Sequence, residues 1–152
     1  MKIYKAYVHV QEEEFMKNRT NVLKIGELHF DAAHYLDESF GKCQYVHGHT
    51  YFVRNMEIIC NKTVDFGKIE EAVNKFDHLL FIPKEHARMW DGMISFAEKI
   101  GLLCKFRFYV LDSDLATVEN IADALRKEIE KIDGVLSAKF ELYEGENKGV
   151  EI

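Results

Sequence analysis

The chain has 152 residues, 47% of them hydrophobic, which predicts one globular domain over residues 1–152 with its own core. Its formal net charge of −6 argues against a general nucleic-acid-binding surface. Three cysteines at irregular spacing, without a leader peptide or an apolar run of about 18 residues, predict a cytoplasmic protein with reduced thiols and no membrane partner.

Strand patterns dominate the first 60 residues. Residues 2–10 are rich in β-branched and aromatic side chains and predict a strand, which the acidic run 12–14 follows as a solvated turn or short helix. Two further strands are predicted at about 22–33 and 49–60. The first half of the chain is therefore predicted to be a β-meander.

Helical patterns dominate the second half. Asp65 is a favoured N-cap, and Ile69, Ala72, Val73 and Phe76 follow it at helical spacing. The remaining elements are predicted in this order: a helix at 84–100, a short strand at 104–111, a helix from Thr117 to about 132, and strands at 136–143 and 148–152. Together these elements predict an α+β fold.

Three histidines suggest a metal site. Alternate side chains of a strand share a face, so the imidazoles of His47-Gly48-His49 point the same way. The partly alternating run that ends at His34 could pair with this strand and bring in a third imidazole. Three imidazoles leave one open position on a tetrahedral Zn²⁺, as in catalytic zinc sites. Alternatively, Cys43 could be a fourth ligand and close the site.

Other residues could carry acid–base chemistry beside such a metal. A thiolate at Cys43 could act as nucleophile or general base. The pair Asp77-His78, at the end of the first predicted helix, could supply a proton relay, although the same pair is typical of a helix end with a surface histidine. Glu144, near the end of a predicted strand, adds a carboxylate that could orient the histidine.

Six motifs occur together in a fixed order: Phe30-Asp31-Ala32-Ala33-His34, Cys43-x₃-His47-Gly48-His49-x-Tyr51, Asp65-Phe66, Asp77-His78, Thr117-x-Glu119-Asn120 and Tyr143-Glu144. From about residue 22 to 145 this pattern resembles the 6-pyruvoyl-tetrahydropterin synthase / 6-carboxy-tetrahydropterin synthase family. The resemblance implies a tunnelling T-fold, which is an antiparallel sheet with helices on one face in ββααββ-like order. It also implies a homo-hexamer of two trimers with active sites between subunits.

The resemblance further implies roles for the matching residues. His34, His47 and His49 would be zinc ligands, Cys43 the catalytic thiol, and Asp77 and His78 its relay partners. Glu144 would grip the guanidine-like edge of a pterin and belong to the catalytic set as well. Thr117 and Glu119 match a substrate-binding motif, although they could equally be an N-cap and a first-turn carboxylate.

The implied reaction is a zinc-dependent lyase reaction on 7,8-dihydroneopterin triphosphate. The spacing Cys43-x₃-His47 resembles the branch that forms 6-carboxy-5,6,7,8-tetrahydropterin, with loss of triphosphate and acetaldehyde, whereas Phe40-Gly41-Lys42-Cys43 resembles the 6-pyruvoyl branch. Two other hypotheses are a non-catalytic module that binds zinc and a pterin, and a hydrolase that uses a zinc-bound hydroxide. The hydrolase would not need Cys43.

The chain departs from the family pattern in four places. Residues 1–21 look like an N-terminal addition, the segment before Asp65 is shortened, and the connection 79–116 is enlarged enough for an extra helix and strand. Ala116 stands where the family commonly has proline. Because loops near a pocket select substrates, these departures concern the substrate more than the metal.

Overall fold

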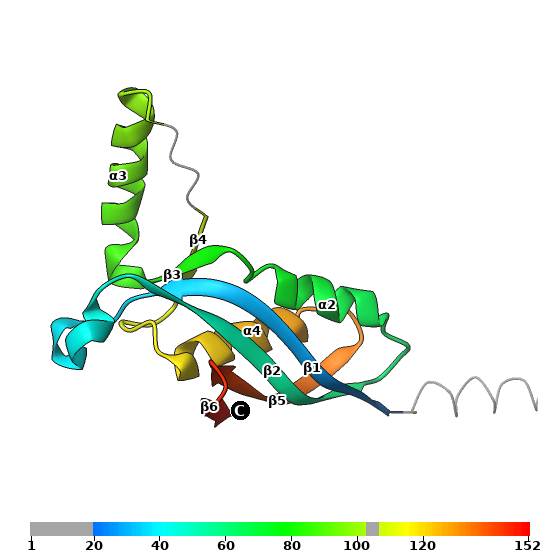
Figure 1. Cartoon of the computed structure of the whole chain (residues 1–152). Coiled ribbons are helices and arrows are strands. Elements are labelled where there is room, and N and C mark those ends of the chain that lie inside the picture. The colour runs from blue at the N-terminus through cyan, green and yellow to red at the C-terminus, as the bar shows by residue number, and fades with distance from the viewer. Residues whose placement is uncertain (1–19, 103–106) are drawn as a thin grey trace, which may run out of the picture.

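The computed structural model describes residues 20–102 and 107–152, so the predicted strand 2–10, the acidic run 12–14 and Cys104 lie outside it. In the described part, six strands form one curled sheet in the order β4-β3-β1-β2-β5-β6 (Figure 1). The strands are β1 (Asn21–His34), β2 (His47–Cys60), β3 (Leu79–Pro83), β4 (Phe108–Leu111), β5 (Val135–Glu144) and β6 (Lys148–Glu151). The helical elements are η1 (Glu38–Gln44), α2 (Phe66–Asn74), η2 (Lys84–His86), α3 (Ala87–Lys99) and α4 (Val118–Glu130). This confirms the predicted α+β class.

The sheet is mixed rather than wholly antiparallel. Strands β1, β2, β5 and β6 pair antiparallel, as predicted. However, β3 pairs parallel with β1, and β4 pairs parallel with β3. Parallel neighbours need a crossover connection, and α3 provides it between β3 and β4. The connection 79–116 therefore widens the sheet beyond β1.

Strand β3 is an element that the sequence pattern did not separate from the enlarged connection. Its five residues, Leu-Leu-Phe-Ile-Pro, are all buried. A short parallel strand with neighbours on both sides buries both of its faces, so it shows a continuous apolar run instead of alternation. The helix predicted at 84–100 begins with the 3₁₀ turn η2, and the strand predicted at 104–111 is described as β4, Phe108–Leu111.

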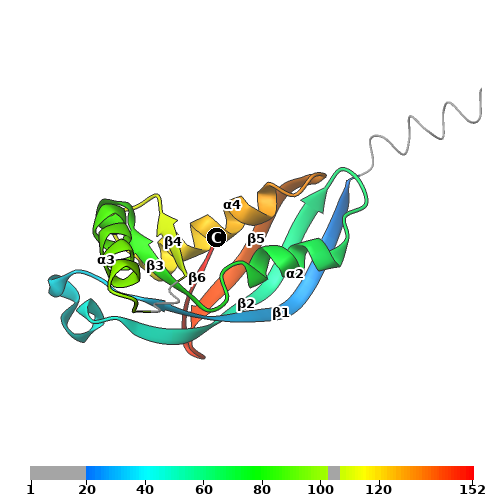
Figure 2. The same ribbon diagram turned by 90° about the horizontal axis from the view of Figure 1, so that it is seen from above.

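Helices α2 and α4 cover one face of the sheet, here called the inner face (Figure 2). Asp65 caps α2 as predicted, because its side chain accepts a hydrogen bond from the Gly67 N–H at 2.9 Å. The main core lies between these helices and the sheet, and the rings of Phe30, Tyr51 and Phe81 pack together within it. Alternation along β1 and β2 places Phe30 and Tyr51 on this face, and Phe81 reaches the same core from β3.

Helix α3 packs on the opposite, outer face of the sheet and stands away from it (Figure 1). Its first turns reach a second apolar cluster through Trp90, which packs against Tyr35, Leu80 and Ile82. The Trp90 indole N–H donates to the Tyr35 hydroxyl at 2.9 Å, and that hydroxyl also contacts His86 Nδ1 at 2.9 Å. Shared packing and hydrogen bonds thus fix the base of α3.

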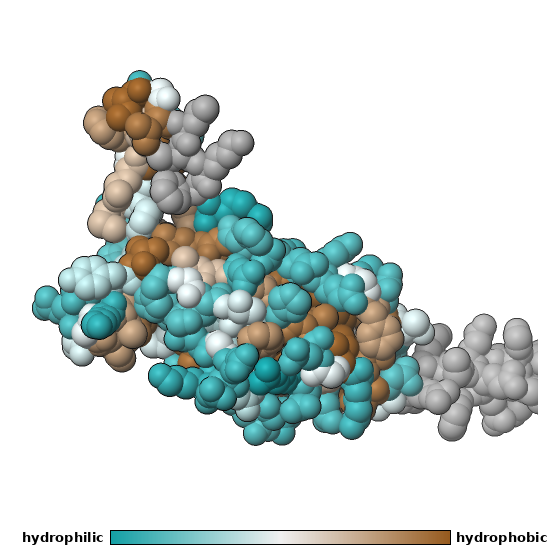
Figure 3. All heavy atoms as spheres, viewed as in Figure 1, coloured by the Kyte–Doolittle hydropathy of each residue, from teal (hydrophilic) through white to brown (hydrophobic). Residues whose placement is uncertain are grey.

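Large apolar side chains are exposed along α3 and just after it, and Figure 3 shows apolar surface at the end of this helix away from the sheet. The exposed residues of this segment are Met89, Met93, Phe96, Ile100 and Leu102. Among the described residues, no helix combines the length and the hydropathy that crossing a bilayer would require.

An irregularity in the middle of β2 changes which residues face the core. Asn55 has a left-handed backbone, with φ of 52°, and the pairing with β5 shifts between Arg54 and Glu57. Before it, Tyr51 and Val53 are buried, whereas after it the even-numbered residues from Met56 onward are buried. The bulge lets both halves of one long strand face the same core.

Replacing Phe81 by alanine is expected to destabilise the fold strongly. The Phe81 side chain has no exposed surface, and its ring lies within 6.3 Å of four other aromatic rings. Loss of a buried phenyl ring costs about 3–5 kcal/mol. Chemical denaturation should show this loss, whereas Phe96→Ala on α3, where the ring is 64% exposed, should change the free energy of unfolding by less than about 0.5 kcal/mol. Similar effects of the two substitutions would contradict this packing.

Candidate metal centre

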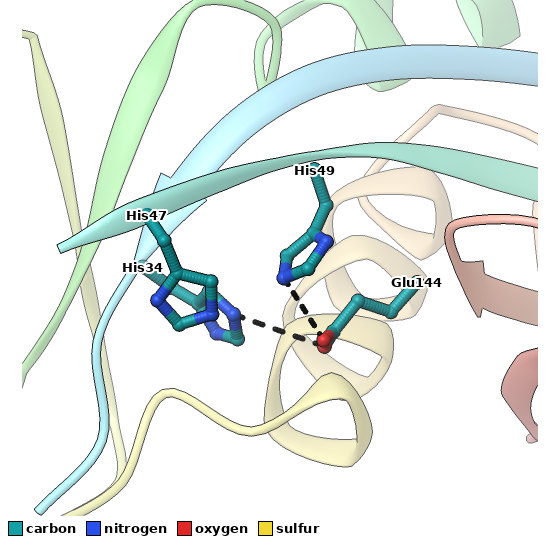
Figure 4. Close-up of side chains that lie close together, drawn as sticks. All are labelled: His34, His47, His49 and Glu144. Carbon is teal, nitrogen blue, oxygen red and sulfur yellow. Dashed lines mark ion pairs between the residues drawn. The ribbon is translucent and has the colours of Figure 1, made fainter. Parts of the chain in front are cut away.

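Three imidazoles and one carboxylate converge on the inner face (Figure 4). His34, His47, His49 and Glu144 each offer one ligand atom, and these four atoms lie within 4.8 Å of one another. His49 Nε2 lies 3.0 Å from Glu144 Oε1, and His34 Nε2 lies 3.8 Å from Glu144 Oε2. Among the described residues, this group could hold a metal ion.

Strand pairing explains why the three histidines meet. His34 ends β1 and pairs with His47, which begins β2, while Ala32 pairs with His49. Residues two apart in a strand share a face, so both imidazoles of β2 lie on the same face as that of His34. Gly48 between them adds no side chain to the outer face, and Figure 4 shows the three rings gathered together. The predicted approach of His34 to this strand is confirmed by the register.

Backbone carbonyls fix the tautomers of two of the histidines. His34 Nδ1 lies 2.7 Å from the Ala116 carbonyl, and His47 Nδ1 lies 2.7 Å from the Tyr45 carbonyl. A carbonyl oxygen only accepts hydrogen bonds, so each Nδ1 carries the proton and donates it. The lone pair of each ring is then on Nε2, the nitrogen available for a metal. Ala116 supplies one of these carbonyls.

Burial keeps two of the rings ready to coordinate. It lowers the pKa of His34, which is 2% exposed, and it also lowers the pKa of His49, in both cases against the opposing effect of Glu144. The rings are therefore neutral near pH 7, and their contacts with Glu144 are not full ion pairs. Nε2 of both residues is buried without a hydrogen-bond partner. Unpartnered imidazole nitrogens facing a carboxylate fit a divalent metal.

Glu144 is the member of this group that the sequence pattern did not place there. The pattern indicated a catalytic and pterin-binding carboxylate, whereas the described structure sets it against the histidines. Its position follows from the end of β5, where it pairs with Tyr51 on β2, and from a tight turn at Gly145, where φ is 68° and the N–H donates to the Thr50 carbonyl at 3.0 Å. Only the strand pairing could have revealed this proximity.

Tyr51 is a buried residue with a polar hydroxyl, and its ring lies beside the histidines of the metal group. Its ring centroid lies 6.0 Å from that of His49 and 6.2 Å from that of His34. Burial, with a smaller effect of Glu144, raises the pKa of Tyr51 far above its ordinary value. Its hydroxyl therefore stays protonated and lacks a hydrogen-bond partner in the described structure.

Cys43 lies in η1, between the two strands that carry the histidines. Its side chain is partly exposed and forms no disulfide. It is not part of the group of four ligand atoms, so the described structure does not assemble the closed site with three histidines and Cys43. The carboxylate of Glu144 takes the fourth place in the group.

Asp77 and His78 form a hydrogen-bonded pair, but not within this group. His78 Nδ1 lies 2.6 Å from Asp77 Oδ2, and the Asp31 N–H donates to Asp77 Oδ1 at 2.9 Å. Although burial alone would raise it, these hydrogen bonds hold the pKa of Asp77 below its ordinary value. His78 has a left-handed backbone with φ of 56°, held by its N–H donating to the Asp31 carbonyl at 2.7 Å. The pair is thus an exposed and conformationally fixed dyad rather than a simple helix end.

Thr117 and Glu119 lie at the start of α4, directly after Ala116. Thr117 occupies the N-cap position, although its side chain makes no capping hydrogen bond. Glu119 is exposed in the first turn. Because the Ala116 carbonyl contacts His34, this helix begins beside the metal group. The substrate-binding role of both residues stays a prediction.

Comparison with known proteins agrees with the sequence pattern. Residues 25–152 match the family model described as 6-pyruvoyl tetrahydropterin synthase. The chain is 31% identical over 140 residues to the 6-carboxy-5,6,7,8-tetrahydropterin synthase of Rickettsia conorii, and the match covers 82% of this chain and 95% of that protein.

Solved structures share the fold. The 6-pyruvoyl tetrahydropterin synthase of Plasmodium falciparum superimposes with a TM-score of 0.55 at 15% identity, over 89% of this chain and 98% of that one. The 6-pyruvoyl tetrahydropterin synthase of Caenorhabditis elegans gives 0.51 at 16% identity, over 90% and 96%. These likenesses confirm the predicted T-fold.

Proposed function

Because the chain belongs to the 6-pyruvoyl tetrahydropterin synthase family, we propose that it converts 7,8-dihydroneopterin triphosphate to 6-carboxy-5,6,7,8-tetrahydropterin, with loss of triphosphate and acetaldehyde. The observation that carries the proposal is the convergence of His34, His47 and His49 with unpartnered Nε2 atoms on two of the rings. The 6-carboxy product is favoured by the name of the relative with 31% identity and by the spacing Cys43-x₃-His47.

We propose zinc as the metal, held by the three imidazoles. Zn²⁺ suits neutral nitrogen ligands in a tetrahedral set with one position left for substrate. When bound, it would act as a Lewis acid toward the side-chain hydroxyls of the pterin substrate. The hydrogen bonds from His34 and His47 to backbone carbonyls would orient these rings and increase their basicity.

The protein's own residues would move the protons and hold the pterin. The Cys43 thiolate would remove a carbon-bound proton beside the substrate hydroxyls. His78, oriented by Asp77, would carry a proton to or from the substrate. Glu144 would accept hydrogen bonds from the guanidine-like edge of the pterin, and Thr117 would lie at the same pocket. Glu144 contacts the histidine rings in the described structure, so binding of pterin would draw its carboxylate from them.

A second copy of the chain would complete the site. The side chains of His34 and His49 lie on the inner face, whereas Asp31, which anchors the Asp77–His78 dyad, points to the outer face with Thr50. Within one chain, the metal group and the strand residue that anchors the dyad therefore point to opposite faces of the sheet. Exposed Phe40, Tyr45 and Val46 surround Cys43 in sequence and support a contact with another subunit. We propose a homo-hexamer of two trimers with active sites between subunits.

The 6-pyruvoyl activity is the second candidate. It is favoured by Phe40-Gly41-Lys42-Cys43, which resembles that branch, and by the names of the solved structures with the same fold. Both activities eliminate triphosphate from the same substrate, so release of triphosphate does not distinguish them.

Mass spectrometry of the products separates the two activities. Purified protein incubated with zinc and 7,8-dihydroneopterin triphosphate is expected to yield 6-carboxy-5,6,7,8-tetrahydropterin and acetaldehyde. A 6-pyruvoyl product without acetaldehyde would establish the second candidate instead. Failure to consume the substrate, in protein that retains its metal, would favour a non-catalytic binding module.

A further inference from the structure

A pocket of about 770 Å³ lies beside the Asp77–His78 dyad, and His49 of the metal group also contributes to its lining. The residues that line it include Asp31, Thr50, His78, Leu80, Trp90 and Arg107. Its size lies within the range of small-molecule sites, about 300–1,000 Å³. Three of these residues, Leu80, Trp90 and Arg107, come from the enlarged connection 79–116. The segment in which the chain departs from the family pattern therefore contributes directly to a pocket at the proposed relay histidine.

The backbone holds Arg107 close to His78. The Leu80 N–H donates to the Arg107 carbonyl at 2.9 Å, and Leu80 lies two residues after His78. The next residue, Phe108, pairs with Leu80 in the sheet. The Trp90 side chain, which also lines the pocket, is held by its hydrogen bond to the Tyr35 hydroxyl. Arg107 thus projects from an ordered sheet edge at the pocket.

The charges around the pocket leave the Arg107 guanidinium available for a ligand. Among the described lining residues, Arg107 is the only lysine or arginine, and no described residue forms an ion pair or hydrogen bond with its exposed guanidinium. The nearby carboxylates already have partners: Asp31 accepts from the Thr50 hydroxyl at 2.6 Å, and Asp77 contacts His78 at 2.6 Å. A planar guanidinium with several N–H donors matches phosphate oxygens in charge and geometry.

We propose that Arg107 binds the triphosphate group of the substrate and that the enlarged connection exists partly to place it there. This inference rests on the proposed function, which supplies a substrate with a triphosphate and a site that His78 shares with a second copy of the chain. Arg107 is a substrate-binding residue from a segment that the family pattern does not include. It sets the preference for a phosphorylated over a dephosphorylated pterin.

Binding of inorganic triphosphate to the full-length protein tests this role without turnover. Arg107→Ala and Arg107→Gln are expected to weaken binding at least roughly tenfold in calorimetry, because a charge-assisted contact is lost. The same variants should raise KM for 7,8-dihydroneopterin triphosphate by a similar factor, with a much smaller change in kcat. Arg88→Ala, which removes another exposed arginine of the same connection outside the pocket, should bind triphosphate like the wild type.

Three results would overturn the role of Arg107: no binding of triphosphate to the wild type, unchanged binding in the Arg107 variants, or equal weakening by Arg88→Ala. The proposed function can fail separately. If the wild type forms no tetrahydropterin but Arg107→Ala still abolishes triphosphate binding, the anion site stands and the proposed reaction is wrong. If the variants form product with unchanged KM and unchanged binding, the reaction stands and Arg107 has no part in it.

Discussion

His47→Ala is expected to remove the metal and, with it, nearly all turnover. His47 provides one of the three imidazoles of the group, and its Nδ1–H donates to the Tyr45 carbonyl, which leaves Nε2 for the metal. Loss of an outer-shell partner alone lowers metal affinity about 10–100-fold, and loss of a ligand should exceed this. Without several kcal/mol of Lewis-acid stabilisation, kcat/KM should fall by about 10³-fold or more.

Elemental analysis and competition with a chelator would measure the metal. His29→Ala serves as the matched control, because His29 lies on the same strand as His34 but is exposed and outside the group of ligands. This control should retain the wild-type zinc stoichiometry. Unchanged stoichiometry in His47→Ala would show that the proposed ligand set is wrong, whatever the activity.

Cys43→Ala is expected to abolish turnover while leaving the metal in place. If the thiolate removes the substrate proton, its loss should lower kcat by about 10²–10⁴-fold, which is the usual contribution of a general base. Zinc content should not change, because the described group of ligand atoms consists of three histidines and Glu144. This combination of lost activity and retained metal distinguishes a thiol mechanism from a hydrolase, which would not need Cys43.

Cys60→Ala is the control for general effects of removing a thiol. Cys60 is fully buried on β2, so the substitution should lower stability moderately but preserve the turnover of the folded protein. Undiminished turnover in Cys43→Ala would refute the proposed thiol mechanism. Loss of zinc in that variant would instead support the alternative in which Cys43 is a ligand.

Local patterns predicted much of the fold. The alternating runs of β1 and β2, the cap at Asp65 and the helix that begins after Thr117 all lie where expected, because each depends on neighbours along the chain. Strand β3 was not predicted, since a strand buried on both faces lacks the alternation that identifies strands. The parallel order of β3 and β4 depends on tertiary pairing, which no local pattern encodes.

The candidate site, like the fold, could be predicted from the sequence only in part. The spacing of His47 and His49 determines their common face, so their convergence could be predicted from alternation alone. The approach of Glu144 could not, because it depends on the pairing of β2 with β5 across more than 90 residues of chain. The place of Arg107 was equally inaccessible, since it follows from the parallel pairing of β3 with β4, which no local pattern encodes.

The bulge at Asn55 makes metal uptake a reporter of strand register. The odd-numbered His47 and His49 precede the bulge on β2 and point to the inner face. After the bulge, the even-numbered Met56, Ile58 and Cys60 are the residues that are buried. Without the bulge toward β5, a regularly alternating β2 could bury one set only by turning the other outward. A metal that binds only the correct register would stabilise it by mass action. Zinc present during refolding should therefore favour chains with the native strand register over misaligned ones, before any catalysis is possible.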